Sequence, residues 1–303
     1  MRERFFNRGI VVCLVAGLCA CGGRSADRLS KIESTRTVND STSISRWEMD
    51  YDRDGYLSTI AFFRDGSLEQ TTRFDYDEGR LLELETTFDS GEVSTIELDW
   101  RAGQLREMEY TEAGDRWVKT FTYDEDNPTR LLASEMERPY GLGTTLRINE
   151  TYRWNAEGQL EEHVRESRTR TDLLDLEVVT KETRERRFAK SGELDRLTVY
   201  LATGGSTDVE QWNYAYASGR LDEIDTDTGK NYRIDYEDGR MVELDYRGGE
   251  GRVVTELTYE SGSIAGDLRW SPPSLPGALH FDVAGTSFPD FPLISPRFLL
   301  GAP

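Results

Sequence analysis

The sequence predicts an all-β fold, an antiparallel meander of about 16–18 short strands that is strongly curled or closed into a barrel-like shell. Two features predict it. A short phrase recurs along the chain, in which an aromatic residue is followed by a turn glycine and then by an aliphatic residue, as in Tyr51 to Leu57 and Trp100 to Leu105. Between these turns, apolar and charged residues alternate, which is typical of strands with one buried face.

The recurring phrase sets the spacing of the predicted hairpins. Gly55, Gly79 and Gly103 lie 24 residues apart, and glycine suits these positions because tight hairpin turns need a positive φ. Other copies, some weaker or shifted, are Tyr76 to Leu81, Tyr123 to Leu131, Trp154 to Leu160, Phe188 to Leu194, Tyr216 to Leu221, Tyr236 to Met241 and Tyr259 to Ile264. A second set of turn glycines is Gly66, Gly91, Gly114, Gly143, Gly204, Gly229 and Gly249.

The segments between turns place aromatic residues on one face and acids on the other. Ile96 to Trp100 and Tyr232 to Tyr236 both alternate in this way, with the β-branched and aromatic residues that strands favour. An open sheet of this size would leave an apolar face and two edges exposed to water. Curling or closure removes both problems, so the rings are expected inside and the acids outside. Little helix is expected.

This phrase resembles the YD repeats of the RHS family and the related short repeats of bacterial lipoproteins of unknown function. The resemblance covers most of the chain after residue 20 and implies stacked β-hairpins in a curled sheet or shell. The self-cleavage element and toxic C-terminal domain of the RHS family have no recognisable match in this sequence. The resemblance therefore implies a fold and not a toxin activity.

The N-terminus predicts export and lipid attachment. Arg2, Arg4 and Arg8 precede a short apolar run, which is the pattern of a signal peptide over residues 1–20. The run is too short to span a bilayer, which takes about 20 apolar residues. Leu18 to Cys21 resembles a bacterial lipobox, which implies cleavage before Cys21 and its diacylation. The glycines after Cys21, with no aspartate beside it, favour the outer membrane by analogy with Gram-negative lipoproteins.

Composition excludes several classes of function. The net charge is −20, so the chain repels phosphate backbones and nucleic acid is not an expected partner. All three cysteines, Cys13, Cys19 and Cys21, lie in the N-terminal region. A chain processed at Cys21 would therefore have no disulfide and no cysteine-based metal site or thiol nucleophile.

The predicted organisation has four parts. After the signal peptide, residues 21–45 are rich in Ser, Thr and charge and are interpreted as a lipidated flexible tether. Residues 46–270 form the repeat domain. Residues 271–303 are rich in proline and aromatic residues and are expected to pack against the sheet, where they would cover an edge or plug an opening. The alternative for this last segment is a disordered tail.

A membrane-spanning barrel is the alternative that the strand length allows. The segment from Leu160 to Arg170 carries charges at alternating positions on both faces, and so does Glu182 to Phe188. A lipid-facing band does not tolerate such charges, because each costs several kcal/mol at the bilayer midplane. The sequence therefore favours a protein that is anchored to the membrane and does not cross it with strands.

Few residues form a recognisable chemical site. Asp50, Asp52, Asp54 and Gly55 match the opening of a calcium loop, but Ala61 occupies the position of the expected bidentate glutamate. Acids on the outer face of a strand before a turn explain the same pattern. His163 is expected to be a surface strand residue and His280 a packing or surface residue. No cofactor is expected, with calcium as the one exception.

The aromatic stripe is the remaining candidate. These residues are interpreted either as the core of the meander or as the lining of a site for a lipid or other apolar ligand. Its members are Tyr76, Trp100, Tyr123, Trp154, Trp212, Tyr216, Tyr236 and Tyr259. The sequence thus predicts a non-enzymatic, lipid-anchored scaffold of the cell envelope that binds a protein, cation or glycan with its acidic surface. The alternatives are a carrier of an apolar ligand and, third, a glycan-active enzyme.

Overall fold

The computed structural model describes residues 28–78, 80–140, 143–171, 176–237, 240–248 and 251–260. The regular structure in these ranges is β-strand, and all 18 strands belong to one sheet. The strands are β1 (Arg28–Val38), β2 (Ser41–Tyr51), β3 (Leu57–Arg64), β4 (Ser67–Asp77), β5 (Arg80–Phe88), β6 (Val93–Arg101), β7 (Gln104–Glu112), β8 (Asp115–Tyr123), β9 (Leu131–Tyr140), β10 (Thr144–Trp154), β11 (Leu160–Thr171), β12 (Leu176–Phe188), β13 (Leu194–Thr203), β14 (Ser206–Ala217), β15 (Arg220–Thr226), β16 (Asn231–Glu237), β17 (Arg240–Gly248) and β18 (Gly251–Glu260). Among the described residues, no helix is long and apolar enough to cross a membrane.

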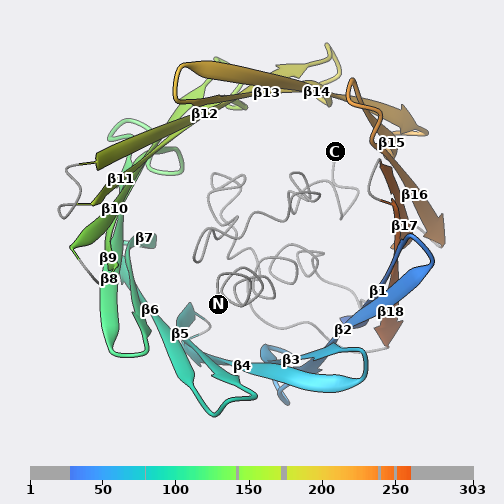
Figure 1. Ribbon diagram of the computed structural model, residues 1–303, viewed down its shortest axis with the longest axis horizontal. Coiled ribbons are helices and arrows are strands. Elements are labelled where there is room, and N and C mark those ends of the chain that lie inside the picture. Colours follow the sequence, from blue (N-terminus) through green and yellow to red (C-terminus); the bar gives the residue numbers. More distant parts are fainter. Residues whose placement is uncertain are drawn as a thin grey trace. The chain divides into compact units, whose positions relative to one another are not determined.

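Strands that follow each other along the chain pair antiparallel. The first strand also pairs with the last: β1 runs antiparallel to β18 from Arg28, opposite Glu260, to Thr37, opposite Arg252, and the two lie side by side in Figure 1. Because β1 pairs with β2 on its other edge, neither edge of β1 is free. The predicted all-β antiparallel meander is confirmed, with 18 strands in the described ranges and with the first and last of them paired.

The recurring sequence phrase forms one kind of hairpin. Its aromatic residue pairs across the strands with its aliphatic residue, and the register shifts at that pair, which is a β-bulge. The leucine of each pair is buried, so the phrase marks the first buried residue of the strand that follows the turn. The pairs with a described register are Tyr51–Leu57, Tyr76–Leu81, Trp100–Leu105, Tyr123–Leu131, Trp154–Leu160 and Phe188–Leu194.

The turns explain the glycines. In the turn between β6 and β7, Ala102 and Gly103 have φ of 51° and 79°, which is the pair of positive values that a two-residue type I′ turn requires. The turn between β1 and β2 uses Asn39 and Asp40 instead, with φ of 47° and 65°. Asn and Asp tolerate this left-handed region better than other residues with a Cβ.

The predicted flexible tether over residues 21–45 is wrong for its described part. Residues 28–38 are strand β1, and β2 begins at Ser41, so the sheet starts before residue 46. Two features concealed β1 in the sequence. Its turn contains no glycine, and a register shift between Leu29 and Lys31 interrupts the alternation of its buried residues. Residues 1–27 and 261–303, and with them the predicted signal peptide and C-terminal segment, lie outside the described residues.

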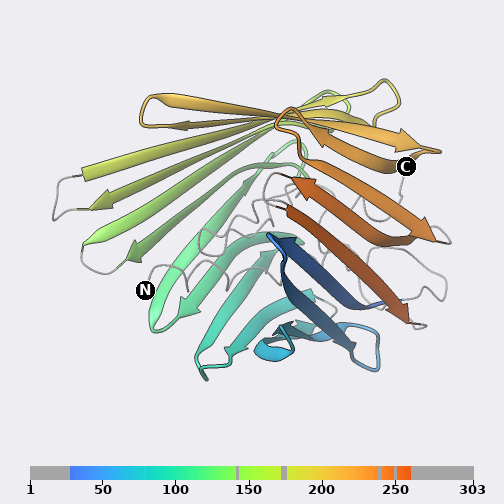
Figure 2. The same cartoon turned by 45° about the vertical axis from the view of Figure 1, so that its right-hand side comes forward.

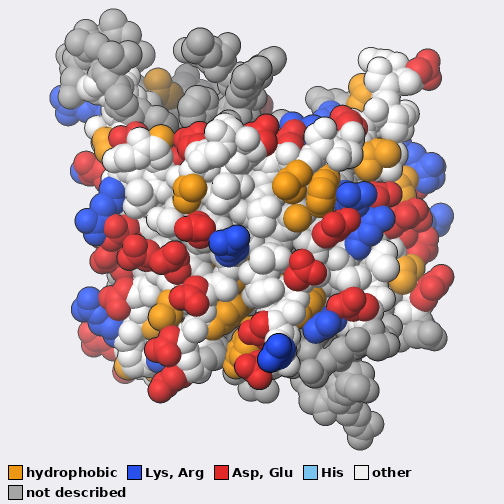
Figure 3. All heavy atoms as spheres, turned by 90° about the horizontal axis from the view of Figure 1, so that it is seen from below, with side chains coloured by type: hydrophobic (Ala, Val, Ile, Leu, Met, Phe, Trp, Pro, Cys, Tyr) orange, Lys and Arg blue, Asp and Glu red, His pale blue; other side chains and the backbone are white. Residues whose placement is uncertain are grey.

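The two faces of the strands differ as the alternation predicts. In β16, Tyr232 and Ile234 are buried, whereas Arg233 and Asp235 are exposed. The exposed side chains mix both signs of charge: Figure 3 shows acidic and basic groups interspersed over one face, with hydrophobic side chains in small separate patches. The exposed surface is thus well solvated, and the core lies on the other side of each strand.

The chain divides into two compact units. The first unit contains the described residues up to 92 with residues 216–223 and 232–260, and the second contains residues 93–215 and 224–231. The second unit holds β11 and β12, with 12 and 13 residues, and all but the last two residues of β14, which has 12. In Figure 2, β11 and β12 are among the green-to-olive ribbons.

Candidate functional site

The eight aromatic residues of the predicted lining are divided equally between the two units. Tyr123 and Trp212 are buried, and the other six are half-buried. Those of the first unit are Tyr76, Tyr216, Tyr236 and Tyr259, and those of the second are Trp100, Tyr123, Trp154 and Trp212. The core interpretation and the lining interpretation both remain compatible with this placement.

Two of these aromatics, and Tyr51 of the first phrase, join one repeat to the one before it. The Trp154 indole nitrogen donates a hydrogen bond to the carbonyl oxygen of Leu131 at 2.8 Å. The Tyr259 hydroxyl donates to the carbonyl of Met241 at 2.9 Å, and Tyr51 donates to the carbonyl of Leu29 at 2.8 Å. Each acceptor is the aliphatic residue of the preceding phrase or, for Leu29, its counterpart in β1. These aromatics therefore have a structural role, whatever else they contact.

The predicted calcium ligands hold a turn together. The Asp52 carboxylate accepts hydrogen bonds from the backbone nitrogens of Asp54 and Tyr56 at 2.9 and 2.8 Å, and Asp50 accepts one from the Thr59 hydroxyl at 3.2 Å. The described residues contain no group of three or more His, Cys, Asp or Glu side chains arranged to hold a metal ion. The geometry of Asp50, Asp52 and Asp54 is thus that of a turn after an exposed strand end.

A cluster of buried polar side chains lies on the buried face of the second unit and contains none of the predicted site residues. Glu150 of β10 is 7% exposed, and its Oε2 accepts from the Lys119 ammonium at 2.5 Å and from the Ser134 hydroxyl at 2.6 Å. The His163 Nε2 lies 3.4 Å from Glu150 Oε1. We call Lys119, Ser134, Glu150 and His163 the buried ion network. Its members come from four neighbouring strands, β8 to β11.

His163 is not the surface residue that the sequence predicts. It is 6% exposed, and its ring stacks on Tyr152 with centroids 4.7 Å apart and planes inclined by 7°. Tyr152 lies directly opposite His163 in the β10–β11 register. The prediction was wrong because Glu161 and Arg165, two residues away on either side, are charged, and the alternation within one strand does not reveal that Tyr152, opposite His163, is buried.

Two further arginines lie among aromatic or ionic partners in this unit. The Arg138 guanidinium donates to Glu112 at 2.8 Å and lies 3.8 Å from the centroid of the Trp117 ring, an arrangement that combines an ion pair with a cation–π contact. On β12, Arg184 pairs with Glu182, and Arg184 lies opposite His163 in the register. The buried face of the second unit therefore carries ionised groups across several strands.

The electrostatics of the network follow from burial and from these partners. Burial alone would raise the pKa of Glu150, but Lys119, with a smaller contribution from His163, outweighs burial and holds that pKa well below its ordinary value. Burial lowers the pKa of His163, and Arg184 and Arg186 add to this against the opposing effect of Glu150. At neutral pH, Glu150 is therefore ionised and His163 is neutral.

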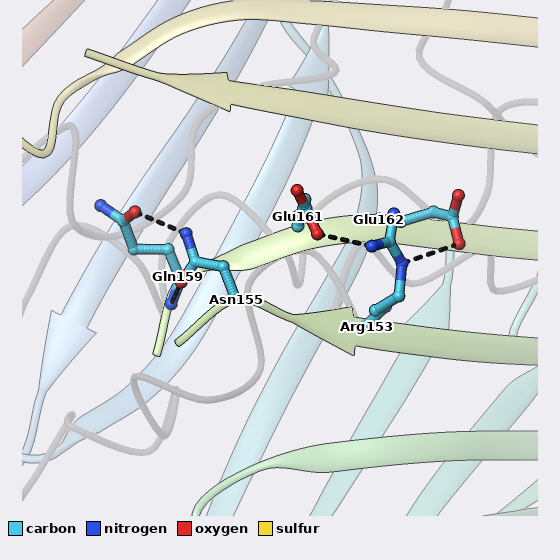
Figure 4. A network of polar contacts seen from close by, with 5 residues as sticks. All are labelled: Arg153, Asn155, Gln159, Glu161 and Glu162. Atoms are coloured by element: carbon cyan, nitrogen blue, oxygen red, sulfur yellow. Dashed lines mark hydrogen bonds and ion pairs between the residues drawn. The ribbon is translucent and has the colours of Figure 1, made fainter. Parts of the chain in front are cut away.

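The exposed polar contacts near the β10–β11 turn differ from the buried ion network. At the β10–β11 turn, Arg153 reaches Glu161 at 2.6 Å and Glu162 at 3.4 Å, and the Asn155 and Gln159 side chains meet at 2.9 Å (Figure 4). Arg153 is 58% exposed in its side chain. Exposed pairs of this kind contribute about 0–1 kcal/mol, so this group orders a turn and does not form a binding site.

The buried ion network is not predicted by the sequence. The run of charges on both faces of residues 160–170 includes His163, but no local signal marks Lys119, Ser134 or Glu150 as its partners. Cys21 and His280 lie outside the described residues.

Comparison with known proteins gives resemblances of fold only. No protein-family model matches the chain, and no curated protein matches it. A porin-like protein from Bacteroides uniformis ATCC 8492 is 12% identical, with 77% of this chain and 98% of that chain covered and a TM-score of 0.34. A porin-like protein from Bacteroides vulgatus ATCC 8482 is 10% identical, with 78% and 99% covered and a TM-score of 0.38. Neither resemblance assigns a function to this chain.

Proposed function

We propose that this chain is a non-enzymatic, lipid-anchored protein of the cell envelope, held at Cys21 in the outer membrane, that binds a protein, cation or glycan partner through the charged faces of its strands. The observation that carries the proposal is the polarity of the strands, with aromatic and aliphatic residues buried and charged residues exposed. A surface of this kind faces water.

The charged surface supports anchoring by lipid over crossing by strands. Exposed positions of β10 include Arg147 and Arg153, and those of β16 include Arg233 and Asp235. An arginine or lysine facing lipid at the bilayer midplane costs about 2–4 kcal/mol. An N-terminal lipid would attach the protein to the membrane without placing these side chains in hydrocarbon.

The anchor is tested with Cys21→Ser in the full chain, expressed in a Gram-negative host. The expected result is that the unaltered chain fractionates with the outer membrane and carries the mass of an acylated Cys21. The Cys21→Ser chain should lack that mass and should no longer be held in the outer membrane through a lipid. A Cys21→Ser chain that stays in the outer membrane and resists alkaline extraction would show a membrane-spanning barrel and overturn the proposal. Cys13→Ser is the matched control, because it lies within the proposed signal peptide and should change neither result.

A carrier of an apolar ligand is the second candidate. The observation that favours it is the partial exposure of six of the eight stripe aromatics, Trp100 and Trp154 among them, because rings that only filled a core would be expected to be fully buried. Lipid extraction of the Cys21→Ser chain followed by mass spectrometry distinguishes the two functions. A stoichiometric co-purified lipid supports the carrier, and none supports the scaffold.

A further inference from the structure

Arg186 of β12 has no described ion pair of its own, and the carboxylate that favours its charge, Glu182, is paired with Arg184. Its Nη1 atom is buried and has no hydrogen-bond partner, whereas the nearby cations Lys119 and Arg184 pair with Glu150 and Glu182. A buried charge without a partner is expensive, and an unsatisfied buried polar group in a folded protein calls for an explanation such as a water or an ion. A water would satisfy the donor but would leave the charge unpaired.

The register places a second donor near this arginine. Arg184, two residues before Arg186 on the same face of β12, lies opposite His163, and His163 lies opposite Tyr152. Arg186 is thus diagonal to His163, a separation that long side chains span, and it interacts electrostatically with Tyr152. The Tyr152 hydroxyl is buried and makes no hydrogen bond of good geometry, and it interacts more weakly with the Glu150 carboxylate, whose counterion is Lys119, and with the Ser134 hydroxyl.

Both groups remain donors at neutral pH. Burial, followed by the charge of Glu150, raises the pKa of Tyr152 well above its ordinary value, so its hydroxyl keeps its proton. Burial, with the neighbouring Arg184, lowers the pKa of Arg186 to about 10, which still leaves the guanidinium charged. A guanidinium group has donors and no acceptor, so the complementary ligand is an acceptor that carries negative charge.

We propose that Arg186, with the Tyr152 hydroxyl as a second donor, binds an oxyanion on the buried face of the second unit, either a carboxylate or a phosphate group. Arginine suits both groups because its planar fork matches their pairs of oxygens. The neighbouring Leu197 and Trp212 are buried, and such apolar surroundings strengthen a charge-assisted hydrogen bond. The site does not depend on the proposed lipid anchor.

The test uses the full chain with Cys21→Ser and follows its thermal unfolding while four probes are titrated in turn: acetate, inorganic phosphate, dodecanoate and the uncharged dodecanol. A ligand of the folded state raises the unfolding temperature in a saturable way. We expect at least one anion to do so. Arg186→Met should lower the affinity for that anion by about 10- to 100-fold, which is the range for a lost charged hydrogen bond. Tyr152→Phe should lower the affinity by a smaller factor.

Arg187→Met is the matched control, because Arg187 is the next residue of β12, is exposed, and pairs with Asp195 at 2.8 Å. It should leave anion affinity unchanged. Without anion, Arg186→Met should be at least as stable as the parent chain, since it removes an uncompensated buried charge, and this shows that a loss of binding is not misfolding.

The probes also identify where the oxyanion comes from. Saturation by acetate or phosphate supports a free small anion, and saturation by dodecanoate but not by the other three supports the head group of an amphiphile. Three results overturn the site: no saturable anion, equal stabilisation by dodecanoate and dodecanol, or equal weakening by Arg186→Met and Arg187→Met.

Discussion

The two units of the molecule use the same hairpin but treat polar groups on the buried face differently. Hydroxyl groups pair with each other in both units: Ser34 with Thr255 at 2.6 Å and Thr72 with Thr86 at 2.9 Å in the first, and Thr226 with Thr228 at 2.8 Å in the second. In the second unit, Glu150 is buried with Lys119 as its counterion. Hydroxyl pairs can be replaced by apolar groups at little cost, whereas a buried ion needs its partner.

Asp245 is the partial exception in the first unit. It is 7% exposed, and it accepts hydrogen bonds from Arg247 and Arg252. The side chains of these arginines are 66% and 53% exposed, so their charges stay in contact with water. In the second unit, by contrast, both side chains of an ion pair are at most 16% exposed in Lys119 with Glu150 and in Arg138 with Glu112.

The largest effect is expected from Glu150→Gln. The variant leaves the Lys119 ammonium buried without a counterion, and breaking a buried pair in this way costs about 3–5 kcal/mol. The free energy of unfolding in urea measures it. Glu137→Gln on the neighbouring strand is the control, because Glu137 and Arg147 are 55% and 60% exposed and such pairs contribute about 0–1 kcal/mol. Equal losses in the two variants would contradict the contrast between the faces.

A second large effect is expected where β1 meets β18. Gly251 has φ of 132°, and a Cβ there would lie 2.2 Å from the Thr37 carbonyl oxygen, so Gly251→Ala should lower the free energy of unfolding by about 2–4 kcal/mol. Gly103→Ala is the control: φ is 79° and no atom lies within 4 Å of the added Cβ, and the expected loss is about 1 kcal/mol. A Gly251→Ala chain as stable as Gly103→Ala would show that this seam is not closely packed.

The pH dependence of stability tests His163. Burial is the main cause of its lowered pKa, so the unfolded chain takes up a proton at this residue before the folded chain does. The contribution of neutral His163 to the free energy of unfolding is therefore fully present above the pKa of histidine in the unfolded chain, about 6.5, and is lost as the pH falls below that value. His163→Phe keeps the ring on Tyr152 and should flatten the unfolding curve between about pH 7 and pH 5.

The other histidine provides the control for that experiment, since the chain has 2 histidines. His280→Gln should leave the slope in this pH range as it is in the unaltered chain. A slope that persists in His163→Phe would assign the titration to another group.

The smallest effect is expected in the first unit from Thr72→Val. Thr72 is fully buried, and the variant removes its hydrogen bond to Thr86, which is worth about 1 kcal/mol. The double variant Thr72→Val with Thr86→Val should recover most of this loss, because no hydroxyl then lacks its partner. If the double variant were less stable than Thr72→Val, the Thr86 hydroxyl would contribute to stability independently of Thr72, and the expected recovery would be wrong.

Much of the fold was predictable because the sequence repeats a physical unit. Leu81 and Leu105 each lie two residues after their turn glycine. A tight turn with positive φ fixes which residues of the two strands pair across the hairpin. The strand β1 was missed because Asn39 and Asp40 form its turn without glycine. The buried ion network was missed because Lys119 and Glu150 are 31 residues apart, and nothing local to either residue predicts the other.

The sequence by itself determined the class of fold, the positions of most turns and the polarity of the strand faces, because these depend on neighbours in the chain. Only the tertiary structure decided that the strands β1 and β18 pair, and which charged residues share a buried face. Both depend on contacts between strands that are distant along the chain. A charged residue has the same local pattern whether its neighbour across the sheet is water, an aromatic ring or a counterion.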